Sequence, residues 1–323
     1  MKYLKLGKSD LTVSVIGQGT WQMGGDFWGV TDDNVMIDTI HAAVDAGINL
    51  IDTAPAYGNG HSQSVVGKAV KGIRDKVVIA DKCGIVWNGK GYDAILKACT
   101  ILLEVEKTLR LLDLDYIDLY QVHWPDAFGT PLEETFEALN ILVEQGKVRY
   151  IGVSNLNLEQ IKKAMQLTNL ISVQPQYSLL ARASEIQIIP FCRENNLGVL
   201  TYGSLGAGVL TGEYITAPTA YLDNRIGFYE FFKDVNLPRC LELVAFTKKI
   251  AAKYGKTPAQ VALNWNIHIP GVTVALCGAT TPQMARENAA AADWDLTKED
   301  TDAIDAEYFR IFGNDKSLNQ KVK

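Results

Sequence analysis

The chain has 323 residues, of which 47% are hydrophobic and 21% are charged, and its formal net charge is -6 at pH 7. This balance is typical of a globular protein with a large buried core. Because the chain is acidic overall and has no concentrated run of Lys and Arg, its charge argues against nucleic acid or an anionic membrane as a partner.

The first 14 residues alternate apolar and polar side chains on both sides of a Gly-Lys-Ser-Asp turn at residues 7–10, which predicts a small β-hairpin. Eight short β-prone runs follow, at residues 15–16, 50–51, 77–80, 117–122, 149–153, 171–174, 198–201 and 272–276. Amphipathic segments predict helices at residues 33–46, 62–70, 92–112, 132–145, 158–165, 185–195, 238–254, 258–267 and 282–292, and one more from residue 298.

Helix-capping residues support several of these boundaries, namely Thr31, Asn157 and Thr257. Strict alternation of strand and helix implies a parallel sheet with helices packed outside it. Eight such repeats favour closure, so the predicted fold class is α/β, a (β/α)8 TIM barrel with the N-terminal β-hairpin closing its bottom. No linker divides the chain, and we expect residues 1–323 to form a single domain.

The five cysteines show neither CxxC nor metal-ligand spacing, and they are Cys83, Cys99, Cys192, Cys240 and Cys277. An odd number of scattered cysteines is typical of buried free thiols in a reducing compartment. The N-terminus does not resemble a signal peptide, and no apolar run reaches the ~18 residues of a membrane span. The sequence therefore predicts a cytoplasmic protein.

Polar side chains follow three of the predicted strands. Asp52 ends the second strand, Lys82 follows the third and His123 follows the fourth, while Tyr57 comes shortly after Asp52. In a parallel barrel the carboxyl ends of all strands lie on one side, so these four side chains are expected to meet there. The sequence thus predicts an active site at the C-terminal mouth of the barrel.

The string Asp-Thr-Ala-x-x-Tyr-Gly at residues 52–58, with Lys82 and His123 after apolar strands, resembles the aldo-keto reductase superfamily. The resemblance extends over essentially the whole chain, with further matches at residues 152–155, 174–180, 202–206 and 278–288. It implies an NAD(P)H-dependent oxidoreductase that reduces an aldehyde, ketone or sugar, with Tyr57 as the general acid. Such an acid must lie within hydrogen-bond reach of the developing alkoxide.

Electrostatics gives each partner of Tyr57 a task. A free phenol has a pKa of about 10, and we expect the Lys82 ammonium to lower the pKa of Tyr57. A lysine removed from water needs a counter-ion, which Asp52 would supply. His123 would then donate to the substrate oxygen and orient the carbonyl.

The resemblance also implies a nicotinamide cofactor, because no side chain can carry a hydride. It assigns the carboxamide of the nicotinamide to Ser154, Asn155 and Gln174, and the face of the ring to Tyr202. The other implied cofactor contacts are Gly19, Thr20 and Trp21 at the mouth, Ser204, Leu205 and Gly208 in the loop over the pyrophosphate, and Gly278, Thr280, Arg286 and Asn288 in the nucleotide clamp.

Cofactor preference stays open at this level. Family members that prefer NADP usually carry Arg or Lys in the clamp, whereas Thr280 stands at the expected position here. Arg286 or Arg225 could substitute, so the cofactor is NADP or NAD. For the substrate pocket we expect Trp28, Trp87 and Trp124, and we expect the irregular segment 206–237 with its aromatic cluster to form a lid or pocket wall.

Two alternative functions remain, both on the same fold. One is an NAD-dependent sugar or alcohol dehydrogenase that works mainly in the oxidative direction. The other is a nucleotide-binding regulatory subunit that resembles the potassium-channel β subunits. A Rossmann fold is disfavoured because Gly17-x-Gly19 lacks the last glycine of the dinucleotide fingerprint. No metal-ligand spacing occurs, so no metal site is expected. The resemblance implies a small carbonyl or alcohol as the partner, and the oligomeric state is open.

Overall fold

The computed structural model describes residues 1–25, 32–214, 229–315 and 318. Eight parallel strands close into a barrel and follow one another around it in chain order. They are β3 (Ile16–Gly19), β4 (Leu50–Asp52), β5 (Val78–Cys83), β8 (Ile117–Val122), β9 (Val148–Ser154), β10 (Leu170–Gln174), β11 (Gly198–Thr201) and β12 (Val274–Gly278). Each overlaps one of the eight predicted runs, so the predicted (β/α)8 barrel is confirmed.

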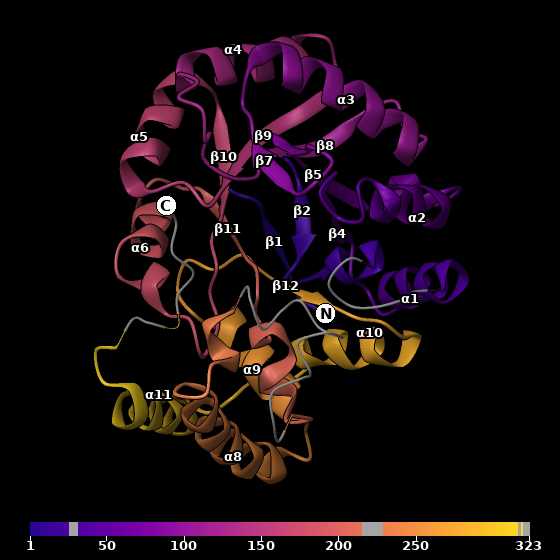
Figure 1. The fold of residues 1–323 in the computed structure, drawn as a ribbon. Helices are drawn as coiled ribbons and strands as arrows, with labels where there is room; N and C mark the ends of the chain where they lie inside the picture. The colour runs from indigo at the N-terminus through magenta and orange to yellow at the C-terminus, as the bar shows by residue number, and fades with distance from the viewer. Residues whose placement is uncertain (26–31, 215–228, 316–317, 319–323) are drawn as a thin grey trace.

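Helices surround the barrel, as Figure 1 shows. The α-helices are α1 (Asp33–Asp45), α2 (His61–Val70), α3 (Ala98–Leu112), α4 (Leu132–Glu144), α5 (Leu158–Leu167), α6 (Ile188–Glu194), α8 (Leu237–Tyr254), α9 (Pro258–Ile267), α10 (Pro282–Ala289) and α11 (Lys298–Phe312). The short 3-10 helices are η1 (Trp21–Gly24), η2 (Arg74–Lys76), η3 (Ala183–Glu185), η4 (Gly206–Thr211), η5 (Glu230–Phe232) and η6 (Ala290–Ala292). No helix in the described part of the chain is long and apolar enough to cross a membrane.

The N-terminal hairpin fills the lower end of the barrel. Strands β1 (Tyr3–Lys5) and β2 (Thr12–Ser14) pair antiparallel, as predicted. Between them, Leu6 is fully buried in one apolar cluster with Leu50 and Val78, the first residues of β4 and β5. The hairpin therefore supplies apolar side chains that close the amino-terminal end of the barrel.

Helix caps agree with the sequence at two of three positions. Asn157 and Thr257 each form a capping box at the start of their helix, as predicted. At α1 the N-cap is Asp32, whose carboxylate accepts from the amides of Asn34 and Val35. The prediction of Thr31 was wrong by one residue, because the carboxylate of Asp32 reaches the free amides of the first turn. Thr31 itself lies outside the described residues.

The main error in the predicted elements concerns residues 92–97, which do not belong to a helix. Strands β6 (Ile85–Trp87) and β7 (Tyr92–Ala94) form a second antiparallel hairpin, and α3 begins only at Ala98. The Asn88 side chain accepts from the amides of Lys90 and Gly91 and so stabilises the connecting turn. Trp87 then faces Tyr92 across the strands, where aromatic pairs are stabilising.

Two further expectations need correction. Cys99 is exposed in the first turn of α3, whereas the other four cysteines are buried as predicted. In the segment 206–237, Phe231 and Phe232 are 0% and 2% exposed and belong to the main apolar core, so they are not pocket walls. Their rings gain more from core packing than from lining a mouth. Residues 215–228 lie outside the described residues.

Candidate active site

The four residues predicted for catalysis meet at the carboxyl end of the barrel. Alternation along β5 turns Val78 and Ala80 into the interior cluster, so Lys82 on the same face also points inward. Asp52 is the last residue of neighbouring β4, and His123 directly follows β8 on the other side of β5. Parallel pairing thus places three strand ends side by side, as predicted.

Lys82 is the centre of the group. Its ammonium donates to Asp52 Oδ1 at 2.5 Å, to the Thr53 carbonyl oxygen at 3.0 Å and to the Tyr57 hydroxyl oxygen at 3.2 Å. An ammonium has three protons, so every donor of Lys82 has a partner. Lys82 and Asp52 are only 1% and 3% exposed, which makes this a buried ion pair.

Burial opposes the charge on Lys82, but the Asp52 carboxylate and the Tyr57 hydroxyl outweigh it and raise the pKa of Lys82. The lysine therefore stays charged at neutral pH. Asp52 has the counter-ion position that the sequence predicted. The pair is held in one geometry because the remaining donors of the ammonium are also satisfied.

Tyr57 departs from the prediction in one respect. Burial raises the pKa of Tyr57 to about 12, although the Lys82 ammonium pulls it in the opposite direction. The expected net lowering was wrong because the sequence revealed the cation and not the low-dielectric surroundings. The residue is nevertheless only half-buried, so its ring keeps some access to solvent at the mouth.

His123, the fourth residue of the group, lies beside the Tyr57 ring. The two rings meet edge to face with their centroids 5.9 Å apart. Burial, helped by the Lys82 charge, holds the pKa of His123 well below its usual range, so the imidazole is neutral at physiological pH. Its Nδ1 atom is buried and has no hydrogen-bond partner among the described residues. A neutral imidazole carries one N–H that can donate to a ligand oxygen.

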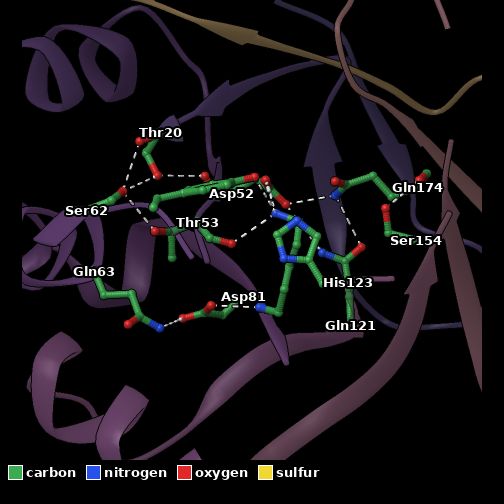
Figure 2. A network of polar contacts seen from close by, with 12 residues as sticks. Thr20, Asp52, Thr53, Ser62, Gln63, Asp81, Gln121, His123, Ser154 and Gln174 are labelled. Carbon is green, nitrogen blue, oxygen red and sulfur yellow. Dashed lines mark hydrogen bonds and ion pairs between the residues drawn. The ribbon is translucent and has the colours of Figure 1, made fainter. Parts of the chain in front are cut away.

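One residue of the site was missed from the sequence. Gln121, on β8, donates through Nε2 to Asp52 Oδ2 at 3.3 Å, beside the 2.8 Å bond that Gln174 Nε2 donates to the same oxygen. Figure 2 shows Gln121 and Gln174 converging on Asp52. The signal was present, because Gln121 lies two residues before His123 and a strand turns alternate residues to the same face.

The residues implied to hold the nicotinamide carboxamide lie next to this group. Ser154 and Gln174 end β9 and β10, and Ser154 Oγ donates to the Gln174 carbonyl oxygen at 2.8 Å. Asn155 adopts a left-handed conformation with φ 59° and donates to the His123 carbonyl oxygen at 2.9 Å. The Tyr202 hydroxyl donates to Asn155 Oδ1 at 2.7 Å. Asn155 Nδ2 also donates to Ser154 Oγ at 3.1 Å, so all four residues belong to one polar network that is buried except at the half-buried Tyr202.

The three residues at and just after the end of β3, namely Gly19, Thr20 and Trp21, differ from one another. Gly19 ends the strand. The Trp21 ring stacks near Tyr57, with centroids 6.1 Å apart, and so belongs to the mouth. Thr20 is fully buried, and its hydroxyl donates to the Asp52 carbonyl oxygen and accepts from Ser62. The Thr20 hydroxyl is therefore engaged by partners within the protein.

The remaining implied cofactor residues lie on two segments beside the mouth. Ser204 and Leu205 follow β11, and Gly208 with φ 96° lies in the kink of η4. In the clamp, Asn288 donates to the Gly278 carbonyl oxygen at 3.1 Å and ties α10 to the end of β12. Both segments therefore lie at the carboxyl ends of β11 and β12, where the resemblance places the dinucleotide.

In the predicted nucleotide clamp, residues 280 and 284 are Thr and Met, so neither carries a cation. The Thr280 hydroxyl contacts the Met284 sulfur at 3.3 Å, and Met284 is 48% exposed. Arg286 lies exposed two residues further along α10. Arg225, the other substitute considered, lies outside the described residues.

The three tryptophans expected in the substrate pocket have different outcomes. Trp124 directly follows His123 and is half-buried, which keeps it at the mouth. Trp87 is 45% exposed on the β6–β7 hairpin, where its ring packs on Tyr92 with centroids 5.1 Å apart. Trp28 lies outside the described residues. Among the described residues, no group of three or more His, Cys, Asp or Glu side chains could hold a metal ion.

A Tyr–Lys–Asp–His group at the mouth of a closed parallel barrel is the site of a nicotinamide-dependent oxidoreductase. Comparison with known proteins agrees. A model of the aldo/keto reductase family matches residues 15–308. The chain therefore belongs to the aldo/keto reductase family.

Individual relatives extend over nearly the whole chain. It is 40% identical to aldo-keto reductase YhdN of Bacillus subtilis (strain 168), with 93% of this chain and 91% of the relative covered. It is 37% identical to the NADH-specific methylglyoxal reductase of Escherichia coli (strain K12), with coverages of 93% and 96%. The solved structure of glycerol dehydrogenase AKR11B4 from Gluconobacter oxydans matches with a TM-score of 0.88 at 36% identity, covering 97% of this chain and 96% of that one.

Proposed function

We propose that this chain reduces the carbonyl of a small aldehyde or ketone with a nicotinamide cofactor, and that Tyr57 is its general acid. The observation that carries the proposal is the hydrogen bond of 3.2 Å between the charged Lys82 and the Tyr57 hydroxyl. A phenol whose oxygen accepts from an ammonium loses its proton more readily than the same phenol buried alone. Tyr57 can therefore deliver a proton to an oxygen that becomes negative during the reaction.

The other residues orient that transfer. The neutral imidazole of His123 lies beside the Tyr57 ring and can donate a second hydrogen bond to the same substrate oxygen. Asp52 keeps Lys82 charged and fixes the direction of its N–H groups. When bound, the nicotinamide supplies the hydride, or accepts it in the reverse direction. Ser154, Asn155 and Gln174 would hold its carboxamide.

The proposed substrate is a small, oxygen-rich carbonyl compound or its alcohol. Two of the relatives are named as a methylglyoxal reductase and a glycerol dehydrogenase, and both names refer to three-carbon compounds with neighbouring oxygens. A substrate of that kind needs polar contacts as well as the Tyr57 and His123 donors. These two names also leave the net direction of the reaction to experiment.

For the cofactor we propose a preference for NAD(H). The phosphorylated cofactor carries two extra negative charges on its ribose and usually meets a guanidinium. In the clamp, Thr280 and Met284 contact each other at 3.3 Å and present a hydroxyl and a thioether instead of a cation. One relative, 37% identical, is named as NADH-specific.

The decisive test is Tyr57→Phe. We expect turnover of methylglyoxal with NADH to fall by at least about a hundredfold, since general acid catalysis typically contributes that much. Binding of NADH, followed by Trp fluorescence, should stay within about twofold of the wild type because the ring of residue 57 is retained. A variant with unchanged turnover would rule out Tyr57 as the acid.

A further inference from the structure

Gln121 is a buried polar residue inside the barrel. It is 0% exposed and lies on β8 one alternation above Leu119, which belongs to the interior apolar cluster. Its side chain therefore points toward the barrel axis at the level of the active site. Register places Gln121 opposite Lys82 on one neighbouring strand and opposite Gly152 on the other.

The amide of Gln121 is engaged at both of its ends. Nε2 donates to Asp52 Oδ2 at 3.3 Å, and Oε1 accepts from Gln174 Nε2 at 3.3 Å. Gln174 Nε2 also donates to Asp52 Oδ2 at 2.8 Å. The three side chains thus form a closed set, visible in Figure 2, in which each contacts the other two.

Asp52 depends on this set because its carboxylate is 3% exposed. Oδ1 is held by Lys82, and the partners of Oδ2 in the described part of the chain are the two amides. A buried carboxylate oxygen without a donor is costly and would weaken the ion pair with Lys82. Gln174 has a second proposed task toward the nicotinamide carboxamide. Whenever its amide turns to that ligand, Gln121 can keep Oδ2 satisfied.

The neighbouring strand leaves room for this arrangement. A Cβ atom at Gly152 would lie 3.0 Å from Cγ of Gln121 and 2.6 Å from Oγ of Ser172. Both distances are shorter than ordinary van der Waals contact. The absence of a side chain at residue 152 is therefore a condition for the observed position of Gln121.

We propose that Gln121 is a positioning residue of the reaction, which holds the Asp52 carboxylate in register with Lys82 while Gln174 serves the nicotinamide. This inference rests on the proposed function. Gln121 acts through Asp52 and Lys82, so its removal should lower the rate of chemistry more than the affinity for NADH.

The test is Gln121→Met, which keeps the volume and shape of the side chain and removes the amide. We expect kcat for methylglyoxal to fall about tenfold, the effect of one hydrogen bond to a charged group, while KM for NADH changes less than about twofold. The control is Asn140→Leu in α4, which removes a part-buried amide that bonds to Leu167 at the end of α5 and to Thr168 just after it. It should lower Tm and leave kcat unchanged.

A second variant, Gln121→Glu, gives a readout that a purely structural role would not move. The titratable groups around residue 121 are Asp52, which it contacts, and Lys82, which lies opposite it on β5. Tyr57 and His123 belong to the same site. An ionised carboxylate at residue 121 would repel Asp52, whereas its protonated form can donate to Asp52. The deficit in kcat relative to the wild type should therefore shrink as pH falls from about 8 to about 5.5.

The outcomes separate the two proposals. A wild-type protein that does not oxidise NADH or NADPH with any small carbonyl contradicts the proposed function itself. An active wild type with a Gln121→Met variant within about twofold of its kcat overturns only the positioning role, as does a Gln121→Glu deficit that is independent of pH. If Gln121→Met does not fold, the soluble Gln121→Glu variant decides by its pH profile.

Discussion

The two faces of strand β5 carry buried titratable side chains in different surroundings. On the inner face, Lys82 pairs with the Asp52 carboxylate and is charged. On the outer face, Asp81 accepts from Gln63 at 2.8 Å and from the Lys82 backbone amide at 2.7 Å, with a second buried acid, Glu104, nearby. No ammonium or guanidinium is bonded to Asp81 among the described residues.

The ionisation of the two faces differs accordingly. Burial raises the pKa of Asp81 from 3.8 to about 7 and that of Glu104 from 4.5 to about 8. The amide donors of Asp81 do not offset the desolvation of its carboxylate, whereas the Asp52 carboxylate does offset the desolvation of the Lys82 ammonium. On β5, the buried side chain that stays charged is thus the one in contact with an opposite charge.

Lys82→Met should have the largest effect, because it removes the cation on the inner face of β5. It leaves Asp52 buried without its cation, so we expect a loss of about 3 to 5 kcal/mol in the free energy of unfolding and no measurable turnover. Urea denaturation and a methylglyoxal assay measure the two effects. The double variant Asp52→Asn/Lys82→Met should recover much of the stability and none of the activity. Equal stability of the single and double variants would show that the unpaired carboxylate is not the cause.

Asp81→Asn tests the effect of the buried carboxyl group on the outer face of β5. Because the folded-state pKa is raised, the proton on Asp81 stabilises the fold fully below about pH 4, and this contribution is lost as pH rises to about 7. The free energy of unfolding of the variant relative to that of the wild type should therefore increase by about 2 kcal/mol from about pH 5 to about pH 8. Denaturation at both pH values measures the gain. Exposed Asp75→Asn is the control, and a similar gain in that variant would contradict the assignment to burial.

Thr280→Arg tests the opposite limit, a charge near the surface. An arginine there can meet the 2′-phosphate of NADPH, and we expect affinity for NADPH to rise about fivefold to tenfold while affinity for NADH stays unchanged. Fluorescence titration with both nucleotides measures the ratio. A further titration at high salt should reduce the gain, since solvent-exposed charges are screened. An unchanged ratio would mean that the phosphate lies elsewhere.

Much of the barrel and its catalytic group was predictable because both follow periodic rules. Strand and helix alternation determined the order of elements, and the common side of parallel strand ends brought Asp52, Lys82 and His123 together. Burial was not predictable in the same way. The pKa of Tyr57 moves up instead of down because desolvation depends on packing around the ring, which no local pattern encodes.

Local competition explains the other differences. At residues 85–94 a turn built around Asn88 and an aromatic cross-strand pair override the helical pattern read over residues 92–97. Gln121 was overlooked because a polar residue in a mostly apolar strand, which also contains Asp118, resembles ordinary barrel filling. Its meaning emerges only when Asp52 and Gln174, distant in sequence, lie against it.

The N-terminal hairpin, by closing one end of the barrel, limits the route by which small molecules can reach the active site. With Leu6 wedged among the first residues of the strands, no small molecule can pass straight through the barrel. In the part of the chain that the structure describes, the proposed substrate, product and nucleotide would therefore reach and leave Tyr57 through the opening at the carboxyl end of the barrel. A segment that narrows this opening would slow product release as much as substrate entry. Residues at the edge of the opening can therefore limit the turnover rate without any change in the chemical step.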